Sequence, residues 1–265
     1  MSDSLIQYES SGAICVLTLN DPPANTYSYE MMQQLDDAIL KARMDESVQV
    51  IVITGAGEKF FCAGANIQML ANVTPTYKYY FCLHANETLS RLEESPKLVI
   101  AALNGHCVGG GLEVALAADI RIARQGAGKL GLPEVSLGVL PGTGGTQRLS
   151  RVVGKSKAIE LMATGELFDF QRGLEFGILN KVFEAETVAQ FQQQVLDYAS
   201  EFTTPKKAAM AVGRIKRSVQ SGAEISFEYG LALERELQQQ LFQSEDAKEG
   251  LAAYVEKRKP EFKGK

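Results

Sequence analysis

Histidine and cysteine are scarce in this chain of 265 residues, and their scarcity excludes two kinds of site. Only His84 and His106 could offer an imidazole, so a His-rich metal site is excluded and no metal site is expected. The four cysteines are scattered and contain no C-x-x-C pair. This spacing favours reduced thiols in or near the core over a disulfide framework.

Positive charge and long apolar runs are also lacking. Lys and Arg number 27 against 32 Asp and Glu, which gives a net charge of -5, and no basic stripe precedes the C-terminal tail. We therefore expect no nucleic-acid partner. No apolar run approaches the roughly 18 to 20 residues that cross a bilayer, and the first residues lack the pattern of a secretory signal. These observations predict a cytoplasmic protein that does not bind a membrane.

The first 186 residues alternate between strand-like and helix-like segments. Buried or alternating β-branched runs predict strands over 14–19, 48–54, 98–103, 119–123 and 179–183. Helical spacing predicts helices over 29–43, 77–94, 112–118, 155–164 and 169–175. Repeated strand-then-helix order is typical of an α/β layered core.

Strand signals end near residue 186. The remainder predicts helices over 187–201, 205–218, 226–243 and 244–257, among which Leu231, Leu237 and Leu241 mark a face that packs on the core or on another subunit. No linker rich in Pro, Gly or Ser separates the two parts. We therefore predict an α/β core over residues 1–186 with a C-terminal helical subdomain over 187–265.

Three short patterns resemble known binding or catalytic motifs, but each lacks a feature that its motif requires. Residues 126–131 match G-x-G-x-x-G, but Pro133 interrupts the place where a dinucleotide-binding helix would start. Residues 154–156 resemble the end of a P-loop, but Leu149 stands where its first glycine is required. Ser136 has Glu134 where a nucleophile elbow requires its first glycine. Neither a nucleotide cofactor nor a serine nucleophile is expected.

The strongest chemical signal comes from two glutamates that lie beside glycine-bounded backbone. Residues 104–113 contain three consecutive glycines and Glu113, and residues 132–138 contain Glu134. Free N–H groups at a helix start favour developing negative charge and can form an oxyanion hole. Two carboxylates can supply the two proton transfers that addition of water to a double bond needs. For Glu113 alone, a helix-capping role explains its position equally well.

Another small-residue turn, over residues 63–67, offers a further N–H to such an oxyanion hole. His106 lies next to the first glycine-rich stretch, where a packed or hydrogen-bonded imidazole is favoured over a catalytic one. Together these stretches describe a site built from backbone donors and carboxylates.

At these residues the chain resembles the crotonase superfamily and, within it, the enoyl-CoA hydratases. Residues 61–67 (FCAGANI) resemble the family's F-x-A-G-A-D-[IL] turn, and 104–113 (NGHCVGGGLE) resemble N-G-x-x-x-G-G-G-x-E. The stretches 130–142 and 144–149 also agree, as does the ending over 254–262, and the similarity covers nearly the whole chain. The resemblance implies a spiral of β-β-α turns and acyl-CoA thioesters as substrates, with no cofactor because coenzyme A is part of the substrate.

The resemblance also implies roles for individual residues. Backbone N–H groups of Ala65 and Gly110 would hold the thioester oxygen. Glu113 would activate the water that attacks the β-carbon, and Glu134 would exchange the proton at the α-carbon. The two glutamates would act on a single water. Other positions would contact coenzyme A or substrate: Ala63, Gly64, Asn66, Ile67, Gly109 and, from a neighbouring subunit, Lys257. The helical subdomain would support a homotrimer or homohexamer and close the active site.

Some positions depart from the family pattern and leave the substrate open. Asn66 replaces the usual Asp and Gln68 a frequent Lys, and the turn over 22–26 is shortened. Aromatic residues over 77–81 either line the acyl pocket or pack in the core. The leading interpretation is reversible syn hydration of trans-2-enoyl-CoA. The alternatives are a Δ3,Δ2-enoyl-CoA isomerase, a hydratase of a branched or cyclic acyl-CoA, and a non-catalytic member that binds acyl-CoA.

Overall fold

The computed structural model describes residues 4–265, and its largest element is a six-stranded sheet of strand order β1-β2-β3-β5-β7-β10. The β1–β2 pair is antiparallel and every other neighbouring pair is parallel. Its strands are β1 (Ile6–Ser11), β2 (Ile14–Leu19), β3 (Val50–Gly55), β5 (Leu98–Leu103), β7 (Ile120–Arg124) and β10 (Lys181–Phe183).

A second, four-stranded sheet is made of very short strands. They are β4 (Phe60–Cys62), β6 (His106–Val108), β8 (Lys129–Gly131) and β9 (Phe168–Asp169), of which the first three run parallel. Each of β3, β5 and β7 in the large sheet is followed along the chain by one of β4, β6 and β8 in the small sheet, and then by helix. This repetition is the β-β-α spiral of the crotonase fold, as predicted.

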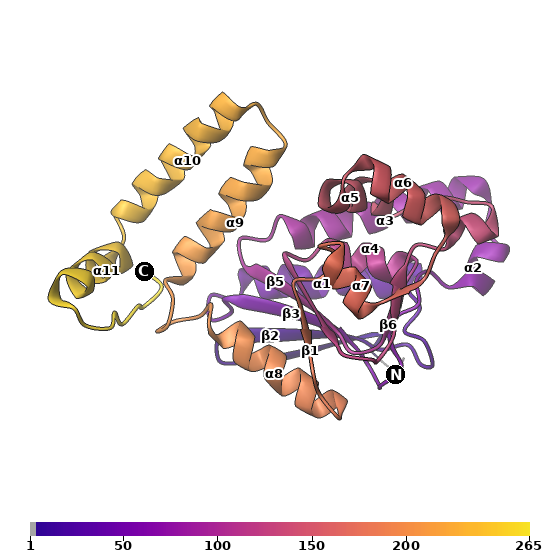
Figure 1. The fold of residues 1–265 in the computed structure, drawn as a ribbon, viewed down its shortest axis with the longest axis horizontal. Helices are drawn as coiled ribbons and strands as arrows, with labels where there is room; N and C mark the ends of the chain where they lie inside the picture. Colours follow the sequence, from indigo (N-terminus) through magenta and orange to yellow (C-terminus); the bar gives the residue numbers. More distant parts are fainter. Residues whose placement is uncertain (1–3) are drawn as a thin grey trace.

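The helices cover these sheets and extend beyond them (Figure 1). Several begin at a side-chain cap, as where Ser28 accepts from the Met31 N–H and Thr74 from the Tyr77 N–H. Their bounds are α1 (Tyr29–Met44), α2 (Ile67–Ala71), α3 (Pro75–Glu93), α4 (Gly110–Leu116), α5 (Gly145–Val153), α6 (Lys155–Thr164), α7 (Phe170–Glu175), α8 (Val188–Ser200), α9 (Ala209–Ala223), α10 (Phe227–Phe242) and α11 (Glu245–Glu256), with a 3-10 helix over Glu134–Leu137.

The central strands β3 and β5 of the large sheet are buried on both faces, and their residues alternate between two cores. Ile51 and Ile53 of β3 join the main core with the helices and the small sheet, while Val50 and Val52 face a second cluster. That second cluster is completed by α8 through Phe191, Val195 and Ala199. Strands buried on both faces explain the continuous apolar runs of the sequence.

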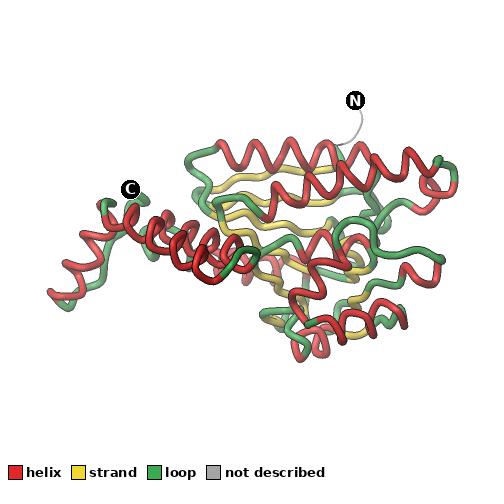
Figure 2. The backbone as a smooth tube through the Cα atoms, turned by 90° about the horizontal axis from the view of Figure 1, so that it is seen from above, coloured by secondary structure: helices red, strands yellow, loops and turns green. Residues whose placement is uncertain are grey.

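The last three helices form an arm that leaves the body of the molecule (Figures 1 and 2). Helices α9 and α10 lie side by side as a hairpin, and α11 sits at the end of the arm. One buried ion pair fastens the start of the arm: Lys216 Nζ on α9 lies 2.8 Å from Asp119 Oδ2 and donates to the Lys97 carbonyl. Many apolar side chains of the arm are exposed, including Val219, Phe227, Tyr229, Tyr254 and Val255.

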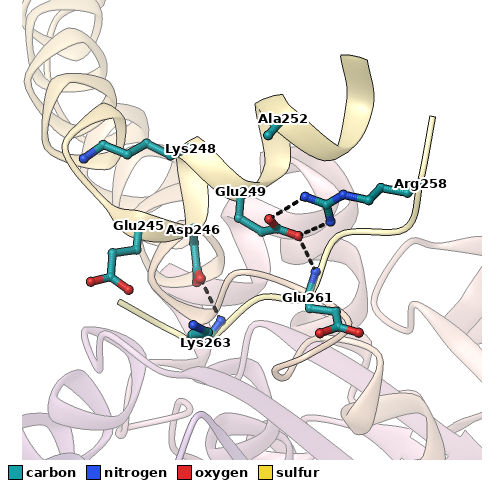
Figure 3. A pocket seen from close by; sticks show the side chains of 8 residues that line it. All are labelled: Glu245, Asp246, Lys248, Glu249, Ala252, Arg258, Glu261 and Lys263. Atoms are coloured by element: carbon teal, nitrogen blue, oxygen red, sulfur yellow. Dashed lines mark hydrogen bonds and ion pairs between the residues drawn. The ribbon is translucent and has the colours of Figure 1, made fainter. Parts of the chain in front are cut away.

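The C-terminal tail folds back along α11 (Figure 3). Buried Asp246 accepts from the N–H groups of Lys263 and Gly264, and Arg258 forms a two-pronged contact with Glu249. The Phe262 N–H donates to the Pro205 carbonyl, which ties the tail to the segment that precedes α9. The arm is therefore closed on itself by its own tail.

The sequence expectations agree with the structure for the long elements and differ at short ones. Strands β1, β4, β6, β8 and β9 and the helix α5 were not expected, and the helix expected over 205–218 lies at Ala209–Ala223. Cys15, Cys62 and Cys107 are buried free thiols, as predicted, and Cys82 is partly exposed. None of the helices described in residues 4–265 is long and apolar enough to span a membrane.

Candidate active site

Three turns that follow the parallel strands of the small sheet meet at one edge. The turn after β4 carries residues 63–66, the turn after β6 carries Gly109 and Gly110, and the turn after β8 carries Glu134. Because the carboxyl ends of parallel strands lie at the same edge of a sheet, three segments that are distant in sequence converge there. The sheet therefore assembles the glutamates and the small-residue turns that the sequence singled out.

Each of the three consecutive glycines is required by a close neighbour. A Cβ atom on Gly110 would lie 2.1 Å from the Tyr27 hydroxyl oxygen, and one on Gly111 would lie 2.0 Å from the Cys62 carbonyl oxygen. Gly109 has a φ of 56°, and a Cβ atom there would lie 3.0 Å from Glu134 Oε1. The backbone at the start of α4 is thus packed between the turn after β4 and the carboxyl group of Glu134.

Two backbone N–H groups at this edge are free to bind a ligand. In the bridge between Tyr27 and Ala65, the Tyr27 N–H donates to the Gly64 carbonyl and the Asn66 N–H to the Tyr27 carbonyl. The N–H of Ala65 takes no part in that bridge and, like that of Gly110, has no protein acceptor within residues 4–265. Gly64 has a φ of 92°, and a Cβ atom there would approach the Gly110 nitrogen to 2.9 Å. The two turns are therefore in direct contact.

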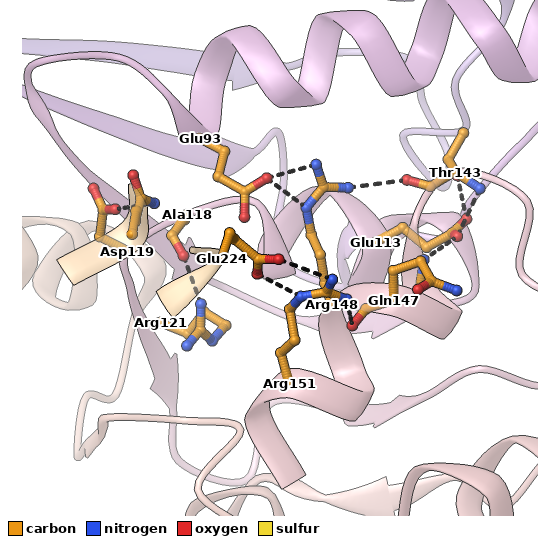
Figure 4. Close-up of polar contacts among 12 residues, drawn as sticks. Glu93, Glu113, Ala118, Asp119, Arg121, Thr143, Gln147, Arg148, Arg151 and Glu224 are labelled. Carbon is orange, nitrogen blue, oxygen red and sulfur yellow. Dashed lines mark hydrogen bonds and ion pairs between the residues drawn. The ribbon is translucent and has the colours of Figure 1, made fainter. Parts of the chain in front are cut away.

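Glu113 is buried on α4, and its carboxyl group is held by the loop before α5 (Figure 4). Oε1 accepts from the Thr143 N–H at 2.7 Å and from the Gly145 N–H at 2.8 Å, while Oε2 accepts from the Thr143 hydroxyl. Because Gly145 is the first residue of α5, the carboxyl group also lies at the positive end of that helix dipole. These contacts fix the orientation of the carboxyl group.

The loop that holds Glu113 is itself anchored by an ion pair. Arg148 on α5 donates through Nε and Nη2 to Glu93 Oε2 at 2.9 and 2.7 Å. Its Nη1 donates to the Thr143 carbonyl at 3.3 Å (Figure 4). The Arg148 side chain thus connects the end of α3 to the residue that contacts Glu113.

Glu134 has a different environment. It is the first residue of a short 3-10 helix, and its Oε2 is buried with no protein hydrogen-bond partner within residues 4–265. Burial raises the pKa of Glu134 to about 7, its own N–H lowers it, nearby Glu113 raises it, and Lys78 lowers it. Two carboxyl groups in one site therefore differ in environment, and Glu134 keeps its proton into the neutral range.

The structure places the other expected site residues as follows. Ala63, Gly64, Asn66 and Ile67 form the turn from β4 into α2, where Asn66 Oδ1 caps α2 by accepting from the Met69 N–H at 3.0 Å. An Asn can fill this capping position as an Asp does. Lys257 ends α11 in the arm and is not brought to the other residues within one chain. His106 is packed and hydrogen bonded: its Nδ1 accepts from the Lys129 N–H.

The sequence did not single out Tyr27 and Thr143. Thr143 is buried between two glycines and contacts Glu113, and the Tyr27 hydroxyl lies 2.9 Å from Thr143 Oγ1. A threonine shortly before a helix start is a capping signal, which was available but points to no partner 30 residues away. Of the aromatic residues over 77–81, Phe81 is buried and stacks on Tyr27, whereas Tyr77, Tyr79 and Tyr80 are exposed.

Comparison with known proteins agrees with this geometry. The family model for enoyl-CoA hydratase/isomerase matches residues 9–265. A probable enoyl-CoA hydratase of Bacillus subtilis is 38% identical, and the alignment covers 95% of each chain. A short-chain-enoyl-CoA hydratase of Clostridium acetobutylicum is 37% identical over 96% of this chain and 95% of its own.

Solved structures are similar along the same length. The crystal structure of an enoyl-CoA hydratase from Geobacillus kaustophilus superposes with a TM-score of 0.95 at 42% identity, covering 100% of this chain and 98% of that one. One from Bacillus anthracis gives a TM-score of 0.91 at 32% identity, covering 98% and 100%. Together with the spiral fold and the contact between the turns after β4 and β6, these similarities show that the chain belongs to the enoyl-CoA hydratase/isomerase family.

Proposed function

We propose that this protein catalyses the reversible syn hydration of a trans-2-enoyl-CoA to a 3-hydroxyacyl-CoA. The observation that carries the proposal is the pair of unlike glutamates beside free backbone N–H groups: Glu113 accepts from two backbone N–H groups, and Glu134 has a buried oxygen with no protein hydrogen-bond partner within residues 4–265. The names of the relatives agree with hydration of this substrate class.

In the proposed reaction, the N–H groups of Ala65 and Gly110 bind the thioester oxygen, where negative charge develops as the β-carbon is attacked. Glu113 takes a proton from water as the water oxygen bonds to the β-carbon. Glu134 gives its proton to the α-carbon, which restores the thioester carbonyl. Transfer of the proton from Glu113 back to Glu134 through water completes the cycle, so that one molecule of water is consumed. The cycle needs no cofactor.

Substrate binding is proposed for the turns that frame these groups. Backbone at Ala63, Gly64, Asn66 and Ile67 lies beside the Ala65 N–H and is suited to coenzyme A, while Gly109 positions the loop above Glu134. Ile67 is 55% exposed and offers an apolar surface at the entrance. The acyl group would extend toward α3, whose aromatic residues flank the same region.

Assembly into trimers or hexamers is part of the proposal. The arm exposes Phe227 at 76%, Tyr229 at 73% and Tyr254 at 86%, an apolar surface of the kind that subunit interfaces cover. Such an assembly would bring Lys257 to a neighbouring subunit, where its charge could meet a coenzyme A phosphate, and would close the active site. A cytoplasmic location stays a prediction from the sequence.

The test is loss of the conjugated enoyl-thioester absorbance when the protein meets crotonyl-CoA. We expect rapid turnover by the wild type, and a decrease of about 10²- to 10⁴-fold in Glu113→Gln and in Glu134→Gln, the range that one general acid or base contributes. A 3-enoyl-CoA is assayed in parallel. Full isomerase activity in Glu113→Gln, without hydration by the wild type, would instead identify an isomerase.

A further inference from the structure

The hydrogen bonds around Glu113 have only one consistent direction. A carboxylate is acceptor only, so the Thr143 hydroxyl must donate its single proton to Oε2. The Thr143 oxygen can then only accept from the Tyr27 hydroxyl, 2.9 Å away. The resulting chain runs from Tyr27 through Thr143 to Glu113.

Both hydroxyl groups are fixed by buried surroundings. Tyr27 is 3% exposed and Thr143 is 2% exposed. The Tyr27 ring stacks on Phe81 with centroids 5.9 Å apart, and its hydroxyl lies against the Cα atom of Gly110, where a Cβ atom would come within 2.1 Å. Burial and the charge of Glu113 raise the pKa of Tyr27 well above its usual value, so it remains a donor.

The two oxygens of Glu113 are therefore not equivalent. Oε1 accepts two backbone N–H groups, which fill its two lone pairs. Oε2 accepts only the Thr143 hydroxyl and keeps one lone pair for a further donor. That remaining lone pair is the position at which a water proton can be received.

We propose that Tyr27 and Thr143 are positioning residues, whose hydroxyl relay aims Oε2 of Glu113 at the attacking water. This inference rests on the proposed role of Glu113 as the base. Tyr27 also contacts Gly110, whose N–H is proposed for the oxyanion hole. One side chain therefore fixes the position of the base relative to the oxyanion loop. Neither hydroxyl group touches the reacting atoms.

The experiment compares kcat and KM of crotonyl-CoA hydration in Tyr27→Phe, Thr143→Val, Thr143→Ser and the double variant Tyr27→Phe/Thr143→Val. Thr143→Val keeps the shape and the backbone N–H but removes the hydroxyl that donates to Oε2. We expect kcat to decrease about tenfold and KM to change less than about twofold. Thr143→Ser restores kcat.

The double variant tests whether the two hydroxyl groups form one chain. Because Tyr27 acts through Thr143, the double variant should match Thr143→Val alone. The matched control is Thr88→Val, which removes a buried threonine hydroxyl on α3 that has no protein partner within residues 4–265 and should leave kcat unchanged. Size-exclusion chromatography and circular dichroism establish that each variant is folded.

The outcomes separate this inference from the proposed function. Wild-type kcat in Tyr27→Phe and Thr143→Val, with Glu113→Gln inactive, would overturn the relay and leave the base assignment standing. Multiplied effects in the double variant would show two independent contacts and also overturn it. Activity in Glu113→Gln would remove the base assignment and the relay with it. If Thr143→Val does not fold, Tyr27→Phe and Thr143→Ser decide the question.

Discussion

At the scale of single residues, the two glutamates of the site differ in their surroundings. Glu113 is surrounded by donors on a loop and a helix start, whereas Glu134 has a buried oxygen with no partner. Hydrogen bonds hold the first carboxyl group in place, and burial disfavours the charge of the second. In the proposed reaction the first acts as the base and the second as the acid.

The raised pKa of Glu134 predicts the same pH dependence for the two directions of reaction. In the proposed cycle the two glutamates share one proton at the start of either direction, and the overall equilibrium releases none, so kcat/KM for hydration and for dehydration should both decrease as the pH rises through about 7. Lys78→Met removes a positive charge that lowers this pKa, so both limbs should move to higher pH. Lys248→Met, in the arm, is the control. An unchanged limb in Lys78→Met would show that Lys78 does not influence Glu134.

A buried carboxyl group with a raised pKa should also reduce stability above that pKa. The folded protein binds the Glu134 proton more tightly than the unfolded chain, so its contribution is full below pH 4.5 and is lost as the pH rises through about 7. Glu134→Gln should therefore match the wild type in free energy of unfolding near pH 4.5. At pH 8 its free energy of unfolding should exceed that of the wild type by about 1 kcal/mol, after allowance for partial exposure, and its Tm should be higher. Equal stability at both pH values would contradict the assigned burial cost.

At the scale of elements, long periodic segments were predictable and short ones were not. Strands β4, β6 and β8 have three residues each, too few to show a period, and α5 opens on Gly145 with few apolar residues. Those elements bring the site together, and the partners of Glu113 are 30 and 32 residues away in sequence. The sequence therefore indicated the glutamates and their turns, but not the contacts that distinguish them.

The docking of α9 depends on the ion pair between Lys216 and Asp119, whose side chains are 3% and 12% exposed. Lys216→Met leaves a buried carboxylate without its cation and should lower stability by about 3 kcal/mol at pH 7, seen as a lower Tm and faster hydrogen exchange in α9. Burial raises the pKa of Asp119 and Lys216 lowers it, so loss of the lysine raises it further and the cost should shrink toward pH 5.

Two further variants test whether this loss comes from the unpaired charge of Asp119. Adding Asp119→Asn should recover part of the loss, because the unpaired charge is removed. Lys157→Met breaks an exposed pair with Glu160 and should leave the stability nearly unchanged. A loss in Lys216→Met no larger than that of Lys157→Met would mean that the pair does not anchor α9.

At the scale of the whole molecule, the arm presents more apolar surface than an isolated chain needs. Light scattering should find a trimer or hexamer, and Phe227→Asp with Tyr229→Asp should shift the mass toward the monomer, because exposed aromatic residues are replaced by like charges. Glu228→Gln, between them, is the matched control. A monomeric wild type would contradict the assembly.

Each successive β-β-α repeat of the spiral supplies a different part of the candidate site. The repeat that starts at β3 supplies the turn over 63–66 and the helices α2 and α3, the repeat at β5 supplies Glu113, and the repeat at β7 supplies Glu134. The helices proposed to lie beside the acyl group are thus on a different repeat from either carboxyl group. Exchange of residues 67–77 between relatives, which keeps Lys78, should change which acyl chains are accepted while the proton chemistry stays intact, so selectivity and reactivity can evolve separately.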